Sequence, residues 1–330
     1  MTLAQALASS RAGNLDHLRL MAAAAVIVSH AWPLALGPGT AEPLKALTGH
    51  SLGGWAVGLF FFLSGLLISA SAARRSPFAF WQARVLRILP GLAVALLVTV
   101  LLAKLGGSSA SLGEAAQYVL RGVTLISLEH QLSGAFAANP YPLAVNGPLW
   151  SLPHEVLAYA VCQAVVLSGL LRRRYGELAF LAGALAMWAV APALPARLAT
   201  FAPLWLAFAL GMCVAGLAAR LRVTPALMVV LVLAAPLGWP FAVLAFGLGA
   251  LALALALPRL PRWGDWSFGL YIYGWPVAQM LVHLSPVALS PVALALASLA
   301  ATLPFAALSW ALVEKPALSR RVAGSKALAA

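Results

Sequence analysis

Charged side chains are scarce in this sequence: Asp, Glu, Lys and Arg make up 9% of its 330 residues. A soluble chain is ordinarily about a quarter charged, so the composition excludes a soluble globular enzyme. Disordered chains are rich in charge and poor in apolar residues, and here 63% of the residues are hydrophobic. The composition therefore predicts an all-α, polytopic integral membrane protein.

Cysteine is nearly absent as well. Cys162 and Cys213 stand in apolar runs without the spacing of zinc ligands, and we expect them to be packing residues. The sequence also lacks a P-loop, a Rossmann glycine fingerprint and a plausible metal-binding triad. We therefore expect no metal ion and no permanently bound cofactor.

Long apolar runs, in contrast, fill the chain. A helix that crosses a membrane needs about 20 largely apolar residues, which predicts ten spans in a single membrane domain over residues 1–330. These spans are 16–36, 52–73, 80–103, 147–171, 178–195, 200–219, 223–238, 240–257, 266–284 and 289–313. The seventh and eighth are short and only Leu237-Gly-Trp-Pro240 separates them, so a re-entrant pair is the alternative there. We expect no internal repeat and no cleavable signal.

The basic residues orient these spans. The net charge is +13, from 21 Lys and Arg against 8 Asp and Glu. With a cytoplasmic N-terminus, 17 of the 21 basic residues fall in cytoplasmic segments, as the positive-inside rule requires. The 4 on the outer side are Lys45, Lys104, Arg121 and Arg197. Both termini are therefore predicted to be cytoplasmic, and the excess of positive charge reflects topology and lipid contact, with no nucleic-acid partner.

One long connection, residues 104–146, falls on the outer side. It is rich in Ser, Gly and Tyr, and connections longer than about 15 residues are often functional. Two interpretations remain open, namely a cap over a polar outer substrate and a plain connecting loop. We expect His130, within it, to be an ordinary surface residue.

Two titratable residues interrupt the predicted spans at similar depth. At 1.5 Å per residue, His30 lies roughly 18 Å and Glu155 roughly 17 Å from the cytoplasmic side. A histidine with a carboxylate partner removes the proton from a hydroxyl nucleophile. The alternative is a buried His–Glu hydrogen bond that only joins two helices. His154 points about 100° away from Glu155 on a helix and is a weaker candidate.

Arg84 and Arg87 form a second candidate site. They are three residues apart at the cytoplasmic start of the third span, so they share one helix face. Two guanidinium groups on one face suit a polyphosphate ligand. The competing interpretation is that they serve topology and contact lipid headgroups.

Glycines punctuate the second predicted span. Gly58 and Gly65 are expected to allow close approach of a neighbouring helix, which is the common role of glycine within membrane spans. Ser64 stands between them without a neighbouring base, and we expect it to be a packing residue.

Five stretches, in this order, resemble the membrane-bound acyltransferase family 3, whose members are bacterial inner-membrane enzymes that acylate cell-surface sugars. The likeness extends from about residue 12 to residue 318. The stretches are Leu15-Asp-His-Leu-Arg-Leu followed by His30, Phe60-Phe-Phe-Leu-Ser-Gly65, Arg84-Val-Leu-Arg87-Ile-Leu-Pro90, Asn146-Gly-Pro-Leu-Trp-Ser-Leu-Pro-His-Glu155 and Ser267-Phe-Gly-Leu-Tyr-Ile-Tyr-Gly-Trp-Pro276.

The resemblance implies an acyl-CoA donor, commonly acetyl-CoA, that enters from the cytoplasm. It implies His30 as the general base, Glu155 as its supporting carboxylate, and Arg84 and Arg87 as the residues that bind CoA. Many members carry a histidine where this chain has Gly274, so no catalytic role is expected there. Some members also append an extracytoplasmic hydrolase-like domain, which is not found here.

Residues in two of the matched stretches are further expected to contact the substrate. They are Asn146, Trp150 and Tyr271.

The sequence therefore predicts an O-acyltransferase of the bacterial inner membrane. It would move an acyl group, expected to be acetyl, from CoA to a hydroxyl of a cell-surface or lipid-linked glycan. Direct attack on the thioester is favoured over a covalent acyl-His30 intermediate. The alternative is a proton-coupled transporter of a glycan or lipid, with His30 and Glu155 as a proton relay. The identity of the acceptor, the acyl length and the oligomeric state are left open.

Overall fold

The computed structural model describes residues 2–40, 42–125, 130–261 and 264–319. Within these residues the elements that connecting loops join are all helices, and one isolated antiparallel bridge joins Gln131 to Ala144. Six of the described helices are long and apolar enough to cross a membrane. The prediction of an all-α polytopic membrane protein is therefore confirmed. The six are Asn14–Leu36, Leu52–Arg74, Pro77–Leu105, Ala196–Leu217, Trp239–Ala256 and Pro291–Ser319.

The chain divides into two compact units, which are described separately. Unit 1 comprises Met1–Arg19, Trp55–Phe80 and His154–Trp263, and unit 2 comprises Leu20–Gly54, Trp81–Pro153 and Gly264–Ala330. The prediction of one domain over residues 1–330 stays a prediction.

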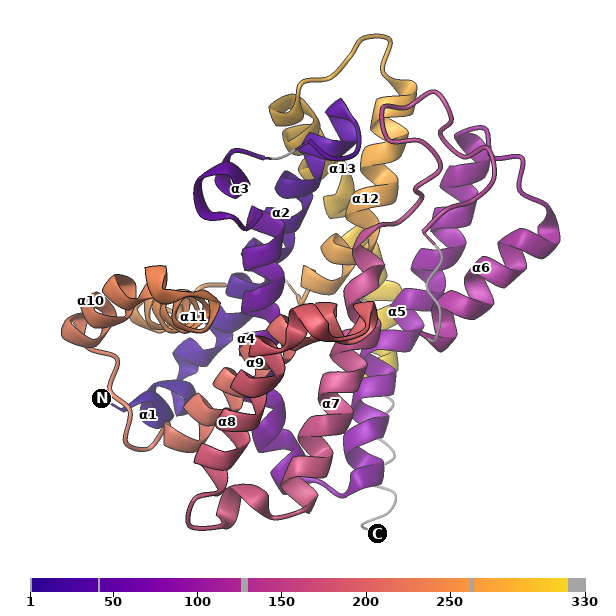
Figure 1. Ribbon diagram of the computed structural model, residues 1–330. Coiled ribbons are helices and arrows are strands. Elements are labelled where there is room, and N and C mark those ends of the chain that lie inside the picture. Colours follow the sequence, from indigo (N-terminus) through magenta and orange to yellow (C-terminus); the bar gives the residue numbers. More distant parts are fainter. Residues whose placement is uncertain (1, 41, 126–129, 262–263, 320–330) are drawn as a thin grey trace. The chain divides into compact units, whose positions relative to one another are not determined.

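Unit 1 contains most of α4 and α7 and several helices of the second half of the chain (Figure 1). Its helices are α1 Leu3–Ala8, α4 Leu52–Arg74, α7 Leu152–Leu167, α8 Gly176–Ala189, α9 Ala196–Leu217, α10 Pro225–Ala234 and α11 Trp239–Ala256. A Cβ atom at Gly65 would lie 1.9 Å from the Phe208 carbonyl oxygen, and one at Gly211 would lie 2.0 Å from that of Phe62. The close approach predicted at Gly65 is thus confirmed, between α4 and α9.

The seventh predicted span is short in the structure. Helix α10 and the 3-10 turn Ala235–Leu237 that follows it reach only about 20 Å at 1.5 Å per residue. A membrane core is about 30 Å thick, so these residues do not by themselves span it as a helix. Helix α11 of the eighth predicted span, in contrast, is long and apolar enough to cross a membrane. Whether 223–238 and 240–257 are two spans or one re-entrant pair stays a prediction.

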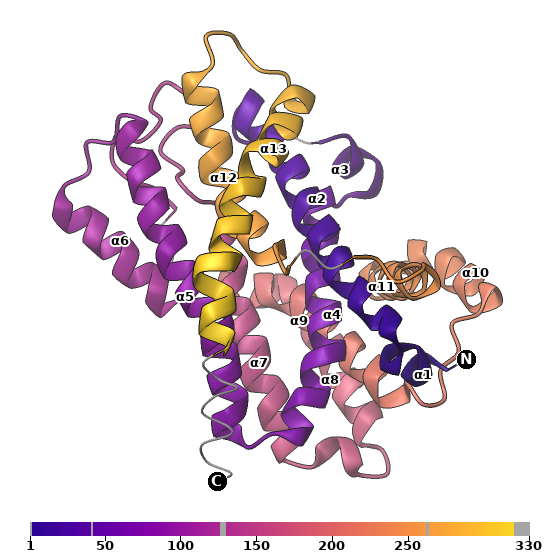
Figure 2. The same ribbon diagram turned by 180° about the vertical axis from the view of Figure 1, so that it is seen from behind.

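Unit 2 holds the remaining helices, among which α12 and α13 pack along each other (Figures 1 and 2). They are α2 Asn14–Leu36, α3 Pro43–Thr48, α5 Pro77–Leu105, α6 Leu112–Thr124, α12 Ser267–Leu284 and α13 Pro291–Ser309, which a π-helical turn, Trp310–Glu314, continues. The segment 104–146, called the outer segment here after its predicted side, contains α6 among its described residues. The side chain of Ser111 caps this helix by accepting a hydrogen bond from the backbone N–H of Glu114.

Candidate functional site

His30 lies on α2 against Trp275, an aromatic side chain of unit 2 that Tyr141 also contacts. Its ring meets Trp275 of α12 edge-on, with 5.0 Å between centroids, and Tyr141 meets the same indole at 5.4 Å. The Trp275 Nε1–H donates to the Ala144 carbonyl at 3.0 Å. Ring contacts and a hydrogen bond thus both restrain the indole. These contacts hold the aromatic wall beside His30 in one orientation.

Gly274 explains how α12 comes so close to α2. A Cβ atom at this position would lie 2.6 Å from Cγ1 and 2.9 Å from Cδ1 of Ile27, closer than two carbon atoms can pack. Ile27 precedes His30 by one helical turn and shares its face. Where many relatives were expected to carry a histidine, this chain therefore has a glycine that lets α12 touch the helix of His30.

Buried amide groups tie the outer segment to α12. The Gln279 side chain, which is fully buried, donates to the carbonyls of Tyr141 at 2.7 Å and Ala144 at 2.8 Å. The Asn139 side chain donates to the Gln279 side-chain oxygen at 2.8 Å and to its carbonyl at 2.9 Å. Satisfying these groups inside an apolar unit holds 139–144 firmly against α12.

The three residues expected to contact substrate differ in exposure. Asn146 is fully buried and donates to the carbonyl of Ile272 at 2.9 Å. Tyr271 is buried, and its hydroxyl donates to the carbonyl of Pro148 at 2.6 Å. Trp150 is 38% exposed. Asn146 and Tyr271 thus hold the 146–148 segment against α12, while Trp150 has open surface, and substrate contact by the three stays a prediction.

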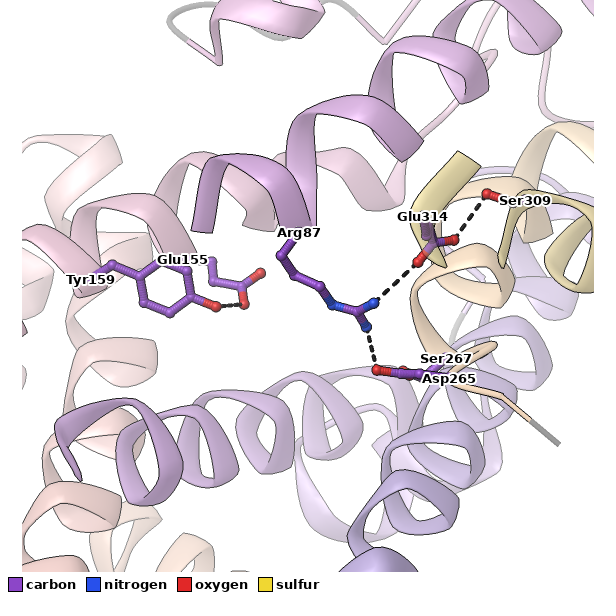
Figure 3. A network of polar contacts seen from close by, with 7 residues as sticks. All are labelled: Arg87, Glu155, Tyr159, Asp265, Ser267, Ser309 and Glu314. Atoms are coloured by element: carbon purple, nitrogen blue, oxygen red, sulfur yellow. Dashed lines mark hydrogen bonds and ion pairs between the residues drawn. The ribbon is translucent and has the colours of Figure 1, made fainter. Parts of the chain in front are cut away.

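Arg87 is the centre of a buried ion network in unit 2, as Figure 3 shows. Its NH2 group lies 2.6 Å from Oδ2 of Asp265, and its NH1 group lies 3.2 Å from Oε2 of Glu314. The Glu314 side chain is 1% exposed, and that of Arg87 14%. One positive charge therefore faces two negative ones in a region where charges are expensive to bury.

Each carboxylate in this network also accepts a serine hydroxyl. Ser267 donates to Oδ1 of Asp265 at 2.6 Å, and Ser309 donates to Oε1 of Glu314 at 2.9 Å (Figure 3). Glu314 ends the π-helical turn that follows α13, and turns of this type are frequent at functional sites. The network was not foreseen from the sequence, although the signal was present: Asp265 and Glu314 are two of only 8 acidic residues in the chain and border predicted spans.

Arg84 precedes Arg87 by one turn of α5 and is partly buried. The sequence expectation that the two share a helix face holds, because α5 is continuous across both positions. Binding of a phosphate by either residue stays a prediction.

Glu155 lies on α7 in unit 1, where its Oε1 accepts a hydrogen bond from the Tyr159 hydroxyl one turn further along (Figure 3). The neighbouring His154 turns to α9, where its ring stacks on Phe201 and its Nε2 lies 3.2 Å from the Thr200 hydroxyl. Because His30 and Glu155 belong to different units, their approach stays a prediction. Among the described residues, no group of three or more His, Cys, Asp and Glu side chains is placed to hold a metal ion.

These features define a class: a multi-pass helical membrane protein with a histidine against an aromatic wall and buried ionic groups within its spans. A family model described as "Acyltransferase domain" matches residues 13–311. The chain therefore belongs to the acyltransferase 3 family and is an acyltransferase, which decides against the transporter alternative.

Two relatives are similar along almost their whole length. The chain is 29% identical to "Nodulation protein 10" of Rhizobium leguminosarum bv. viciae, over 95% of each protein. It is also 29% identical to the "O-acetyl transferase" of Shigella phage Sf6, over 92% of this chain and 96% of the relative. No solved structure matches the chain.

Proposed function

We propose that the protein moves an acetyl group from acetyl-CoA, supplied on the cytoplasmic side of the bacterial inner membrane, to a hydroxyl of a cell-surface or lipid-linked glycan. The observation that carries the proposal is the setting of His30, a titratable ring inside a membrane helix, fixed against Trp275, in a chain of the acyltransferase 3 family. A relative whose name is "O-acetyl transferase" supports acetyl as the acyl group.

His30 acts as the general base in this proposal. Its imidazole takes the proton of the acceptor hydroxyl while the oxygen attacks the thioester carbonyl, and the C–S bond then breaks to release CoA, which leaves as the thiol after proton uptake. Glu155 orients the ring and stabilises its protonated form. A covalent acyl-His30 intermediate is the less favoured route, and it predicts ping-pong kinetics.

Arg84 and Arg87 bind the donor with different tasks. A guanidinium has five N–H donors, and the hydrogen bonds to Asp265 and Glu314 engage only some of those on Arg87. Arg87 is therefore a fixed group that presents its remaining donors, while Arg84 adds the positive charge that a phosphate needs beside two carboxylates.

Replacement of His30 by alanine tests the base. In purified protein, His30→Ala should lower acetyl transfer by about 100-fold to 10,000-fold, the usual contribution of a general base, and leave the affinity for CoA unchanged. His154→Ala is the matched control, because this histidine contacts Thr200 and Phe201 on α9, and it should retain transfer. Unaltered turnover of His30→Ala would contradict the role of His30 as the general base.

A binding measurement tests the donor site. Arg84→Ala should weaken the affinity for acetyl-CoA by about tenfold or more, because a charge-assisted hydrogen bond contributes about 1.5 to 3 kcal/mol, while Arg84→Lys should recover part of it. Arg197→Ala, a basic residue assigned to the outer side, should leave the affinity as it is. Equal affinities of wild type and Arg84→Ala would remove Arg84 from the donor site.

A further inference from the structure

A cavity of about 510 Å³ opens in the outer segment of unit 2, and neither Arg84 nor Arg87 belongs to its lining. It is lined by Glu114 on α6 and by residues of the 130–143 segment: His130, Gln131, Leu132, Ser133 and Leu143. Figures 1 and 2 show α6 beside α5 at the margin of this unit. The volume falls within the range of about 300 to 1,000 Å³ that is usual for ligand sites.

Hydrogen bonds within the segment fix the walls of this cavity. The Ser133 backbone N–H donates to Oε1 of Glu114 at 2.7 Å, which ties α6 to the facing strand of chain. Gln131 pairs with Ala144 in the isolated bridge. His130 Nδ1 lies 3.2 Å from the Asn146 carbonyl. Asn146 is also one of the buried residues that hold the outer segment to α12, so the same residue supports the wall of the cavity.

Several polar atoms of the lining remain available to a ligand. Because a carbonyl only accepts, His130 Nδ1 carries the hydrogen of this contact, and Nε2 makes no hydrogen bond among the described residues. The second carboxylate oxygen of Glu114, the Gln131 amide and the Ser133 hydroxyl make no hydrogen bond among the described residues. The lining thus offers both donors and acceptors, with Leu132 and Leu143 as apolar surface between them.

This chemistry suits a neutral, polyhydroxylated ligand. The lining contains one carboxylate and neither Lys nor Arg, so a phosphate-bearing ligand such as CoA is repelled. A carboxylate accepts hydrogen bonds from neighbouring hydroxyls of a sugar, amide and hydroxyl groups complement the remainder, and leucine side chains contact the C–H face.

A chain of contacts in unit 2 connects the lining of the cavity to His30. Leu143 lines the cavity, and the next residue, Ala144, accepts the hydrogen bond from Trp275, whose indole contacts His30. Neither His30 nor Trp275 belongs to the lining, so a ligand in the cavity does not touch the candidate catalytic ring. A single sugar cannot fill this cavity and also offer its hydroxyl to His30.

We infer that this cavity is an acceptor subsite that binds a sugar unit next to the one that is acetylated, so that the enzyme takes oligosaccharide or longer glycan acceptors in preference to single sugars. The inference rests on the proposed function. It assigns Glu114, Gln131 and Ser133 to acceptor binding, and it excludes them from the chemical step.

The test uses purified full-length protein and labelled acetyl-CoA. The probes are the glycan fraction of cells that lack the gene, used intact, and the same fraction hydrolysed to monosaccharides. We expect faster transfer to the intact fraction. Glu114→Gln and Gln131→Ala should each raise the KM for it by about threefold to tenfold, as expected for one lost hydrogen bond, with kcat and the KM for acetyl-CoA unchanged. Gln117→Ala, an exposed residue of α6 outside the lining, is the control.

The outcomes separate the two proposals. Transfer to the intact fraction with unchanged KM values in both variants, or equal transfer to monosaccharides, overturns the subsite and leaves the proposed function standing. A wild-type protein that transfers acetyl to neither fraction overturns the proposed function and the subsite with it. Loss of kcat in Gln131→Ala, whose side chain makes no hydrogen bond to other described residues, would place the cavity in the chemical step and also contradict the inference.

Discussion

Gly274 illustrates how much a single residue determines in this protein. The absence of a side chain there allows α12 to contact Ile27 of α2, and the following residue, Trp275, forms the wall beside His30. A glycine within a helix costs about 1 kcal/mol relative to alanine. The chain tolerates this cost because close packing of the two helices determines where the His30 ring lies.

Gly274→Ala should therefore destabilise unit 2 by about 1 to 3 kcal/mol, the usual effect of overpacking, and lower turnover through displacement of His30. Thermal unfolding and acetyl-transfer rates of purified protein measure the two effects. Gly183→Ala is the matched control, since a Cβ atom at this helical position meets nothing within 4 Å. Ile27→Ala in the Gly274→Ala background should restore part of the stability, and full additivity would contradict the proposed clash.

The π-helical turn Trp310–Glu314 shows the same dependence at the scale of an element. It delivers Glu314 to Arg87 of α5, while Asp265, just before α12, reaches the same guanidinium. The Arg87 side chain thus joins three segments that are distant in sequence: α5, the residues just before α12 and the turn after α13. Removing one partner of a buried ion pair is more damaging than replacing the whole pair, because it leaves an uncompensated charge.

A double-mutant cycle should reveal this coupling. Arg87→Ala leaves the buried carboxylate of Glu314 and the partly buried one of Asp265 without their cation, and it should cost about 3 to 5 kcal/mol of unfolding free energy. Adding Glu314→Ala should cost less than the sum of the single changes, because it removes one of those carboxylates. The measurement is thermal or denaturant unfolding in detergent. Strict additivity of the two substitutions would show that the network contributes no coupling energy.

The outer segment is a second element whose position depends on few groups. Gln279→Leu would remove the donors to Tyr141 and Ala144 and the acceptor for Asn139. We expect faster amide hydrogen exchange in residues 139–146 and slower acetyl transfer, with α9 of unit 1 unaffected. Unchanged exchange in 139–146 would contradict the anchoring role of Gln279.

At the scale of the whole molecule, the distribution of basic residues predicts the orientation in the membrane. With 17 of 21 Lys and Arg assigned to the cytoplasmic side, the energetics of insertion favour cytoplasmic termini. In this predicted orientation α6 and the cavity would lie outside, and Arg84 and Arg87 would lie at the cytoplasmic face. The donor and the acceptor of the proposed reaction would then approach His30 from opposite sides of the membrane.

Cysteine labelling in intact bacterial cells tests this orientation. In a background with Cys162 and Cys213 replaced by alanine, Leu112→Cys on α6, an 86% exposed position, should react with a membrane-impermeant maleimide. Arg173→Cys should react only after the membrane is permeabilised. The reverse pattern would invert the topology and separate the arginine pair from cytoplasmic acetyl-CoA.

The sequence predicted the helices well and the contacts poorly. Every predicted span contains a helix, because an apolar run in a membrane must satisfy its backbone hydrogen bonds internally. Helix α6 was missed because its polar, amphipathic composition resembles that of a loop. His30 was proposed as a site residue because a titratable residue in an apolar run is conspicuous. Asp265 and Glu314 were passed over because acidic residues are ordinary at the borders of spans.

The scarcity of charge by itself determined that this chain is a multi-pass helical membrane protein, and the order of its motifs indicated an acyltransferase. Composition suffices for this because the bilayer penalises every charge and every unpaired backbone group within it. The tertiary structure alone decided which residues contact one another: Gly274 and Ile27, Trp275 and His30, and Glu314 and Arg87. Such pairings join residues far apart in the chain and depend on how helices pack, which the apolar pattern of each helix does not specify.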